Sequence, residues 1–181
     1  ADLCTELGET LDDEQTWRYS LREGVTFHDG SEMTAEDLAY NFDWAANPEN
    51  NAQVLGYAPQ LEHAETEIID DYTVELTLND SQSMWNSWMT RIIEGLVPAD
   101  SRGGLEEAKG PKGLGTDLTT EPVGTGPFEF EEWQTGSHVH MTAFDDHRRE
   151  DVPHADEFRF EIVVEASSRL SQLRSGSSDM M

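Results

Sequence analysis

Residues 17–42 contain the stretch that decides the fold, and they read Trp-Arg-Tyr-Ser-Leu-Arg-Glu-Gly-Val-Thr-Phe-His-Asp-Gly-Ser-Glu-Met-Thr-Ala-Glu-Asp-Leu-Ala-Tyr-Asn-Phe. Trp17, Tyr19 and Leu21 alternate with polar side chains, which is the period of a strand with one buried face. This pattern predicts a half-buried strand over residues 17–21.

The second half of the stretch predicts a turn followed by a helix. Val25 and Phe27 start a second short apolar face, which favours another strand. Asp29-Gly30 then forms a turn pair, because glycine adopts a positive φ without steric cost. Thr34 is a good helix N-cap, and the acidic residues that follow it suit the positive end of the helix dipole. Apolar residues recur beyond them at helical spacing.

This order of residues closely resembles the signature block of the extracellular solute-binding proteins that deliver peptides, and in some members nickel, to ABC transporters. The family pattern is roughly Trp-x-Phe-x-Leu-Arg-x-Gly-Val-x-Phe-His-Asp-Gly-x-x-Leu-Thr-Ala-Glu-Asp-Val. The matching positions here are Leu21-Arg22, Gly24-Val25, Phe27-His28-Asp29-Gly30 and Thr34-Ala35-Glu36-Asp37. Within this block we expect His28 and Asp29 to shape a turn and to contact no ligand.

Further motifs of the same family follow in the same order. Asp70-Asp71-Tyr72-Thr73-Val74 resembles the end of a family hairpin, and residues 122–130 resemble its Pro-x-Gly-Thr-Gly-Pro-[Phe/Tyr] turn. Leu173, Gly176 and Asp179 fit its closing Leu-x-x-Gly-x-x-Asp run. Asp146-His147-Arg148 departs from the aromatic element that the family usually carries there. The resemblance implies a fragment of the first of two lobes, so the chain would contain one wall of the binding cleft and would not bind ligand measurably alone.

The remaining chain is predicted from local patterns. We expect a hairpin of strands over 61–69 and 72–78, a helix over 81–93, a mobile glycine-rich excursion over 98–121, and strands around 128–130, 139–143 and 158–164. Ser167 or Ser168 would cap a last short helix that ends at Gly176. The fold class is α/β, with mixed sheets and flanking helices, as part of one lobe of a two-lobed binding-protein fold. Residues 1–121 would form a peripheral subdomain of the lobe, and residues 122–181 part of its core subdomain.

Charge is the second informative feature. The chain has 38 acidic and 11 basic residues among 181, a net charge of −27. The acids occupy outward positions of patterned elements, which is typical of a halophilic protein whose self-repulsion is screened in concentrated salt. No basic stripe exists, which excludes nucleic acid as a partner. Cys4 is the single cysteine, so we expect an ordinary thiol and no disulfide. No transmembrane run is present.

The candidate ligand-binding residues are Trp85, Trp88 and Arg91. Trp85 and Trp88 are three positions apart and share a helix face, and the resemblance places this segment on the cleft. Both tryptophans could instead fill the core, and Arg91 could form a structural salt bridge rather than pair a ligand carboxylate.

The histidines suggest a metal site as an alternative. His138 and His140 would project from one strand face, with His147 and His154 following, but no spacing fixes a carboxylate or cysteine partner. We therefore assign no metal and no cofactor. The residues show no catalytic motif, so we expect no enzyme.

The resemblance implies the substrate-binding receptor of an ABC importer, most simply one for oligopeptides or dipeptides, working with membrane permease subunits. Such a receptor would be extracellular, cell-surface or periplasmic, and tethered to the membrane. Two alternatives remain: a nickel or metal-chelate receptor of the same family, and a salt-adapted carbohydrate hydrolase.

Overall fold

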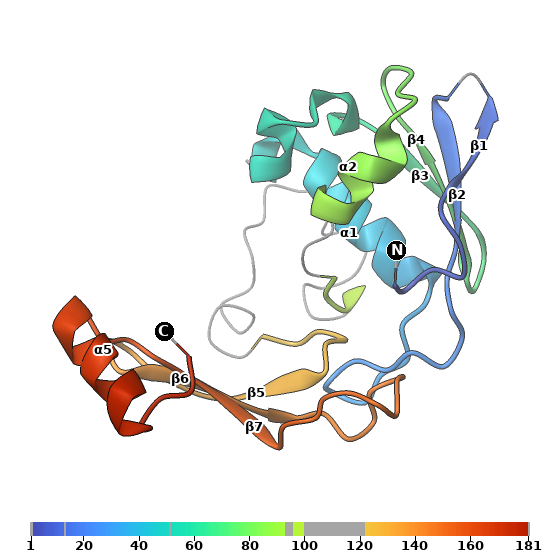
Figure 1. Ribbon diagram of the computed structural model, residues 1–181. Helices are drawn as coiled ribbons and strands as arrows, with labels where there is room; N and C mark the ends of the chain where they lie inside the picture. Colours follow the sequence, from blue (N-terminus) through green and yellow to red (C-terminus); the bar gives the residue numbers. More distant parts are fainter. Residues whose placement is uncertain (1, 13, 51, 93–95, 100–121, 181) are drawn as a thin grey trace. The chain divides into compact units, whose positions relative to one another are not determined.

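The computed structural model describes residues 2–12, 14–50, 52–92, 96–99 and 122–180 (Figure 1). The chain folds into two compact units, each considered separately below. The first comprises Ala1–Gly126 with Asp146–Glu150, and the second comprises Pro127–Asp145 with Asp151–Met181. The predicted α/β class, with sheets and flanking helices, is confirmed. Most of the predicted excursion over 98–121 lies outside the described residues.

The first unit contains a four-stranded antiparallel sheet in the order β1-β2-β4-β3. The strands are β1 (Glu9–Asp12), β2 (Thr16–Ser20), β3 (Glu65–Asp70) and β4 (Thr73–Thr77). The strand predicted over 17–21 and the hairpin of β3 and β4 are present. On one face, Trp17 and Tyr19 are paired with Leu76 and Val74 and are buried. On the other face, the Arg18 Nε donates to Glu75 Oε1 over 2.9 Å.

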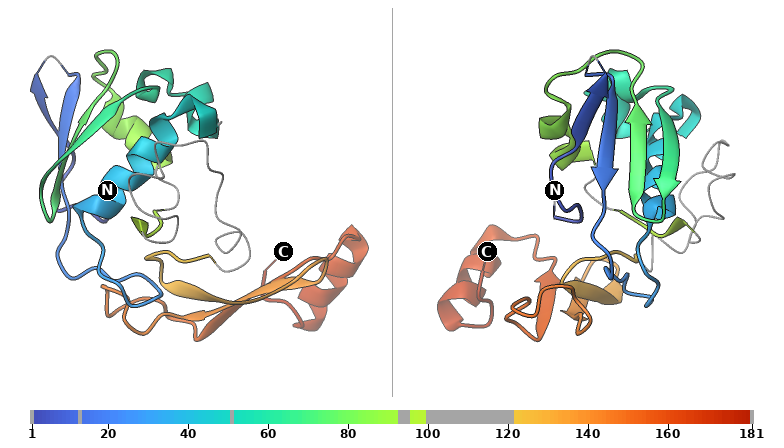
Figure 2. Two further views of the ribbon diagram at one scale, coloured as in Figure 1. Left: turned by 180° about the vertical axis from the view of Figure 1, so that it is seen from behind. Right: turned by 90° about the vertical axis from the view of Figure 1, so that its right-hand side faces the viewer.

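Helices cover the apolar face of this sheet. The long helix α1 (Ala35–Ala46) and the shorter α2 (Trp85–Ile92) lie on the same side of it (Figures 1 and 2). Three 3-10 turns, Pro48–Asn50, Gln53–Gly56 and Pro59–Leu61, connect α1 to β3. The Thr66 hydroxyl donates to Asp43 Oδ1 of α1 over 2.6 Å, which ties β3 to the helix. The core therefore lies between the sheet and α1.

Three local predictions for this unit need correction, and one of its strands was not predicted. The strand expected at Val25 and Phe27 does not form: both side chains are buried, but only an isolated bridge joins Thr26 to Glu32. Strand β3 begins at Glu65 rather than 61, because Leu61 ends a 3-10 turn and is fully buried. Helix α2 begins at Trp85, later than predicted. Strand β1 was not predicted, because its sequence Glu-Thr-Leu-Asp shows little alternation.

The second unit is a three-stranded antiparallel sheet with one helix. Its strands are β5 (Phe128–Gln134), β6 (His138–Ala143) and β7 (Glu157–Glu161), in that order, and its helix is α5 (Ala166–Ser175). Glu165, not Ser167 or Ser168, is the N-cap residue of α5. Gly176 ends the helix with φ 73° and ψ 19°, as predicted.

No helix in the described part of the chain is long and apolar enough to cross a membrane.

Candidate functional site

Helix α2 carries the three residues predicted to contact ligand. Its first residue, Trp85, has no exposed surface and belongs to the core cluster of the first unit. This burial favours the core alternative for Trp85, because a fully enclosed indole offers no face to a ligand. Its indole N–H faces the buried Tyr19 hydroxyl.

Trp88 lies one turn further along α2 and is only partly buried at the edge of the core. Its ring stacks on Tyr57, with centroids 6.4 Å apart and planes inclined by 23°. Tyr57 itself is 44% exposed. The two rings thus form an aromatic surface that a solute could reach, unlike Trp85. The side chain of Arg91 lies outside the described residues.

The block at residues 17–42 and the family motif at residues 122–130 meet in the structure through His28. The backbone N–H of Gly124 donates to His28 Nδ1 over 3.3 Å, and His28 Nε2 lies 2.9 Å from the carbonyl oxygen of Gly126. Because Nδ1 accepts, the proton resides on Nε2, which donates to Gly126. The His28 backbone N–H also donates to the Gly124 carbonyl over 2.9 Å. We call this arrangement the His28 clamp.

The His28 clamp explains why histidine and an adjacent aspartate occur in this turn. Asp29 Oδ1 accepts from the Ser31 N–H over 2.9 Å and from its hydroxyl over 2.6 Å, which closes the turn locally. Gly30 has a φ of 84°, the conformation that the Asp-Gly pair predicts. These bonds are to the protein itself, which agrees with the expectation that His28 and Asp29 serve architecture.

A second connection is anchored beside the His28 clamp. The Thr26 hydroxyl donates to the Asp146 carbonyl over 3.2 Å, and Arg148 forms an ion pair with Asp2. Along the chain, Asp146–Glu150 separates the two parts of the second unit, but it belongs to the first unit. The loop around residues 26–28 therefore contacts two later segments of the first unit, at residues 124–126 and at Asp146.

The two histidines of strand β6 are already engaged by charged partners. His138 is 4% exposed, and its Nδ1 lies 3.2 Å from Arg159 Nη2, which must donate. Its Nε2 lies 3.4 Å from Glu132 Oε2, and His140 Nε2 lies 2.9 Å from Glu157 Oε2. The positive charge of Arg159 beside His138 Nδ1 would repel a metal cation at that nitrogen. The described residues contain no group of three or more potential metal ligands.

Comparison with known proteins places this architecture in a family. The model of the bacterial extracellular solute-binding proteins, family 5 Middle, matches residues 1–181. The glutathione-binding protein GsiB of Salmonella paratyphi A is 28% identical over 165 residues, which are 91% of this chain and 30% of that protein. The chain thus spans about a third of the length of such relatives.

Solved structures share the fold. NikZ from Campylobacter jejuni, solved in complex with Ni(L-His), superposes with a TM-score of 0.80 at 22% identity, over 97% of this chain and 33% of that one. The oligopeptide-binding protein AppA from Bacillus subtilis, solved with a nonapeptide, superposes with a TM-score of 0.77 at 24% identity, again over 97% and 33%. At these identities the two matches confirm the fold alone.

Proposed function

Since the chain belongs to the family 5 bacterial extracellular solute-binding proteins, we propose that it is part of the substrate-binding receptor of an ABC importer. The observation that carries this proposal is the match of the family model along all 181 residues. The predicted lobe of a periplasmic-binding-protein fold agrees with the solved structures that superpose on it. The family consists of binding proteins, which sets the hydrolase alternative aside.

The proposed ligand class is a peptide. GsiB is a glutathione-binding protein, and AppA from Bacillus subtilis was solved with a nonapeptide, so two compared proteins take peptide-like ligands. Capture would occur between two lobes that close about a hinge, followed by delivery to permease subunits. The receptor would act outside the cytoplasmic membrane and be tethered to it. This chain would supply one wall of the cleft.

A nickel or metal-chelate ligand is the second candidate, favoured by the fold shared with NikZ. The partners of His138 and His140 argue against those two histidines as the nickel ligands. A nickel chelate could still be held by its organic part, so the two ligand classes must be compared directly.

Among the three predicted site residues, Trp88 has the best support as a ligand contact. It is partly exposed and forms a flat aromatic surface with Tyr57, on which a peptide side chain or backbone could lie. Trp85 would act only indirectly, by supporting α2 from the core. Arg91 remains a proposal from the sequence.

Calorimetry on the full-length protein tests the function. We expect heat from glutathione or from peptides of two to nine residues in concentrated KCl, and none from nickel with histidine. Trp88→Ala should weaken peptide binding at least about tenfold, because it removes one aromatic side chain that contacts the ligand. Trp133→Ala is the matched control, because Trp133 is 48% exposed in the second unit.

Two outcomes would contradict these proposals. The first is binding heat from nickel with histidine that disappears in His138→Ala and His140→Ala, with no heat from any peptide. That result would show a metal receptor rather than a peptide receptor. Micromolar peptide binding by the 181-residue chain alone would refute the expectation that one cleft wall is insufficient.

A further inference from the structure

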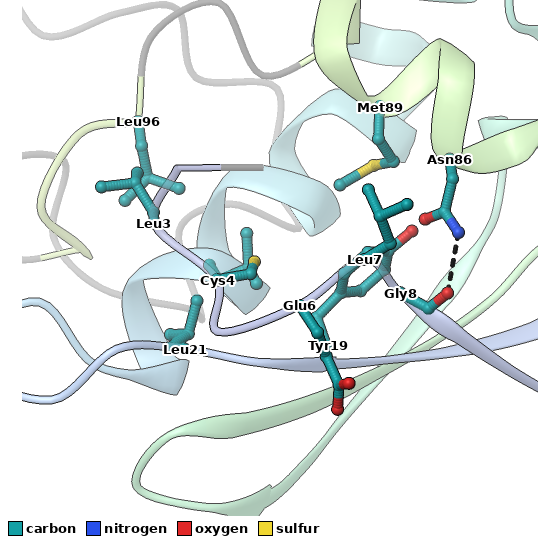
Figure 3. Close-up of a pocket in the computed structure, with 11 residues that line it drawn as sticks. Leu3, Cys4, Glu6, Leu7, Gly8, Tyr19, Leu21, Asn86, Met89 and Leu96 are labelled. Atoms are coloured by element: carbon teal, nitrogen blue, oxygen red, sulfur yellow. Dashed lines mark hydrogen bonds between the residues drawn. The ribbon is translucent and has the colours of Figure 1, made fainter.

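A pocket of about 270 Å³ lies in the first unit, between the segment that precedes β1 and helix α2 (Figure 3). Its apolar walls come from Leu3, Leu7, Leu21, Leu38, Met89 and Leu96. Apolar protein cavities of roughly 150 Å³ already accept benzene. This pocket therefore has room for a molecule of about ten non-hydrogen atoms.

Tyr19 brings a hydrogen-bonding group to the wall of this pocket. The residue is 3% exposed, and its hydroxyl is buried beside the Trp85 indole N–H, with no acceptor for its own proton among the described residues. A buried hydroxyl whose proton has no acceptor is costly, and native structures rarely keep one without a reason. The Tyr19 hydroxyl is thus a donor at this pocket that a ligand could satisfy.

The Tyr19 ring is held in place on two sides. A Cβ at Gly8 would lie 2.4 Å from Tyr19 Cε1, so the ring packs directly on the glycine backbone. The Asn86 side-chain amide donates to the Gly8 carbonyl over 2.7 Å, which fixes that backbone (Figure 3). The Phe42 ring lies 6.0 Å from the Tyr19 ring between centroids. The hydroxyl therefore cannot swing out to solvent.

The protonation state of Tyr19 and the charge of the lining residues indicate which ligand the pocket would accept. Burial raises the pKa of Tyr19 far above that of an ordinary phenol, and the neighbouring Trp85 indole offsets this rise only in part. The hydroxyl therefore keeps its proton and is available as a donor. Glu6 is the one carboxylate among the described lining residues, and it would repel an anion.

We propose that this pocket binds a small neutral molecule with an apolar body, whose carbonyl or ether oxygen accepts a hydrogen bond from the Tyr19 hydroxyl. None of the residues that line this pocket is among those proposed to contact the transported solute. Its ligand class is that of aryl ketones, aryl ethers and similar compounds, rather than peptides or metal chelates.

Cys4 provides a reporter for the test, because it is the single cysteine, lines the pocket and is partly buried. We would measure its alkylation rate with iodoacetamide in the 181-residue chain in concentrated KCl. Acetophenone and α-methylstyrene are matched probes, since the second replaces the carbonyl oxygen by a methylene group. We expect acetophenone to slow alkylation at a concentration about fivefold lower than α-methylstyrene requires. A factor of about five in affinity corresponds to one hydrogen bond of about 1 kcal/mol.

Variants assign the effect to Tyr19. In Tyr19→Phe the two probes should become equally effective, whereas Tyr57→Phe, at a tyrosine outside the pocket, should preserve the fivefold ratio. The ¹³C-methyl resonance of Met89 should shift with either probe in the unaltered chain. If Tyr19→Phe does not fold, the proposal is still tested by the potency ratio of the two probes and by the Met89 shift, both measured in the unaltered chain.

The proposal is overturned if, up to the solubility limit of each probe, neither probe slows the alkylation of Cys4 and neither shifts the Met89 methyl resonance. Equal potency of the two probes in the unaltered chain, or a ratio that survives in folded Tyr19→Phe, overturns it as well. These readouts do not involve transport, so their failure leaves the proposed receptor function intact, and loss of peptide binding leaves the pocket proposal intact.

Discussion

At the scale of the residue, the His28 clamp joins parts of the chain that lie 98 positions apart. We expect His28→Ala to lower the free energy of unfolding by about 2 kcal/mol, because the Gly124 N–H and the Gly126 carbonyl both lose a partly buried partner. Urea denaturation followed by tryptophan fluorescence measures this. His154→Ala, at an exposed histidine, should change stability by about 0.5 kcal/mol or less. Equal effects of the two substitutions would mean that the clamp contributes nothing.

The pair formed by Tyr72 and Glu32 predicts a pH effect at the same scale. The Tyr72 hydroxyl donates to Glu32 Oε1 over 2.7 Å and, with the Gly24 N–H, lowers the pKa of Glu32. The same bond raises the pKa of Tyr72 to about 12. The Glu32 contribution to stability is therefore present above its ordinary pKa and is lost as the pH falls through the lowered value. The Tyr72 contribution is complete below about pH 10 and is lost as the pH rises through 12.

Tyr72→Phe should raise the pKa of Glu32 toward its ordinary value without reaching it, because the Gly24 N–H remains. A ¹³C carboxyl titration by NMR measures this pKa, with Tyr57→Phe as the control that leaves it unchanged. An unaltered Glu32 titration in Tyr72→Phe would show that the bond does not persist in solution.

At the scale of the element, helix α1 is fixed at its start by a buried carboxylate. Asp37 is 7% exposed; its Oδ2 accepts from the Thr34 N–H over 2.7 Å, and its Oδ1 accepts from the Ala99 N–H over 2.8 Å. Asp37→Ala should cost about 2–3 kcal/mol of unfolding free energy, since both donors lose a charged acceptor. Glu36→Ala removes an exposed charge from the same helical turn and should cost about 0.5 kcal/mol. Denaturation midpoints compare them, and similar losses would mean that only the helix dipole matters.

At the scale of the whole molecule, a net charge of −27 predicts salt-dependent folding. Raising KCl from about 0.01 to 1 M shortens the screening length from about 30 to 3 Å and weakens the repulsion between carboxylates. We expect the thermal midpoint to rise by about 10 °C or more between 0.1 and 2 M KCl, a few kcal/mol for a chain of this size. Circular dichroism at 222 nm follows it, and NaCl should act equally if screening is the cause. A midpoint independent of salt down to a few millimolar would refute the halophilic interpretation.

Local patterns in the sequence were sufficient for most elements of both units. The alternation of Trp17 and Tyr19 predicted β2, Thr34 and the acids after it predicted the start of α1, and Gly176 predicted the end of α5. Each of these signals acts within a few residues, so it is legible without knowing the fold. The family motifs, read in order, also identified the family that the comparison confirms.

Tertiary structure decided what depends on distant contacts. Periodicity placed Trp85 and Trp88 on one helix face but could not show that the core encloses Trp85 and leaves Trp88 beside Tyr57. It also suggested a strand at Val25 and Phe27, whose apolar side chains instead enter the core from a loop. The sequence alone thus determined the elements and the family, because those rest on local order. Only the tertiary structure brought His28 to Gly126 and Tyr19 to Gly8, because such contacts exist only once the sheets and helices have packed.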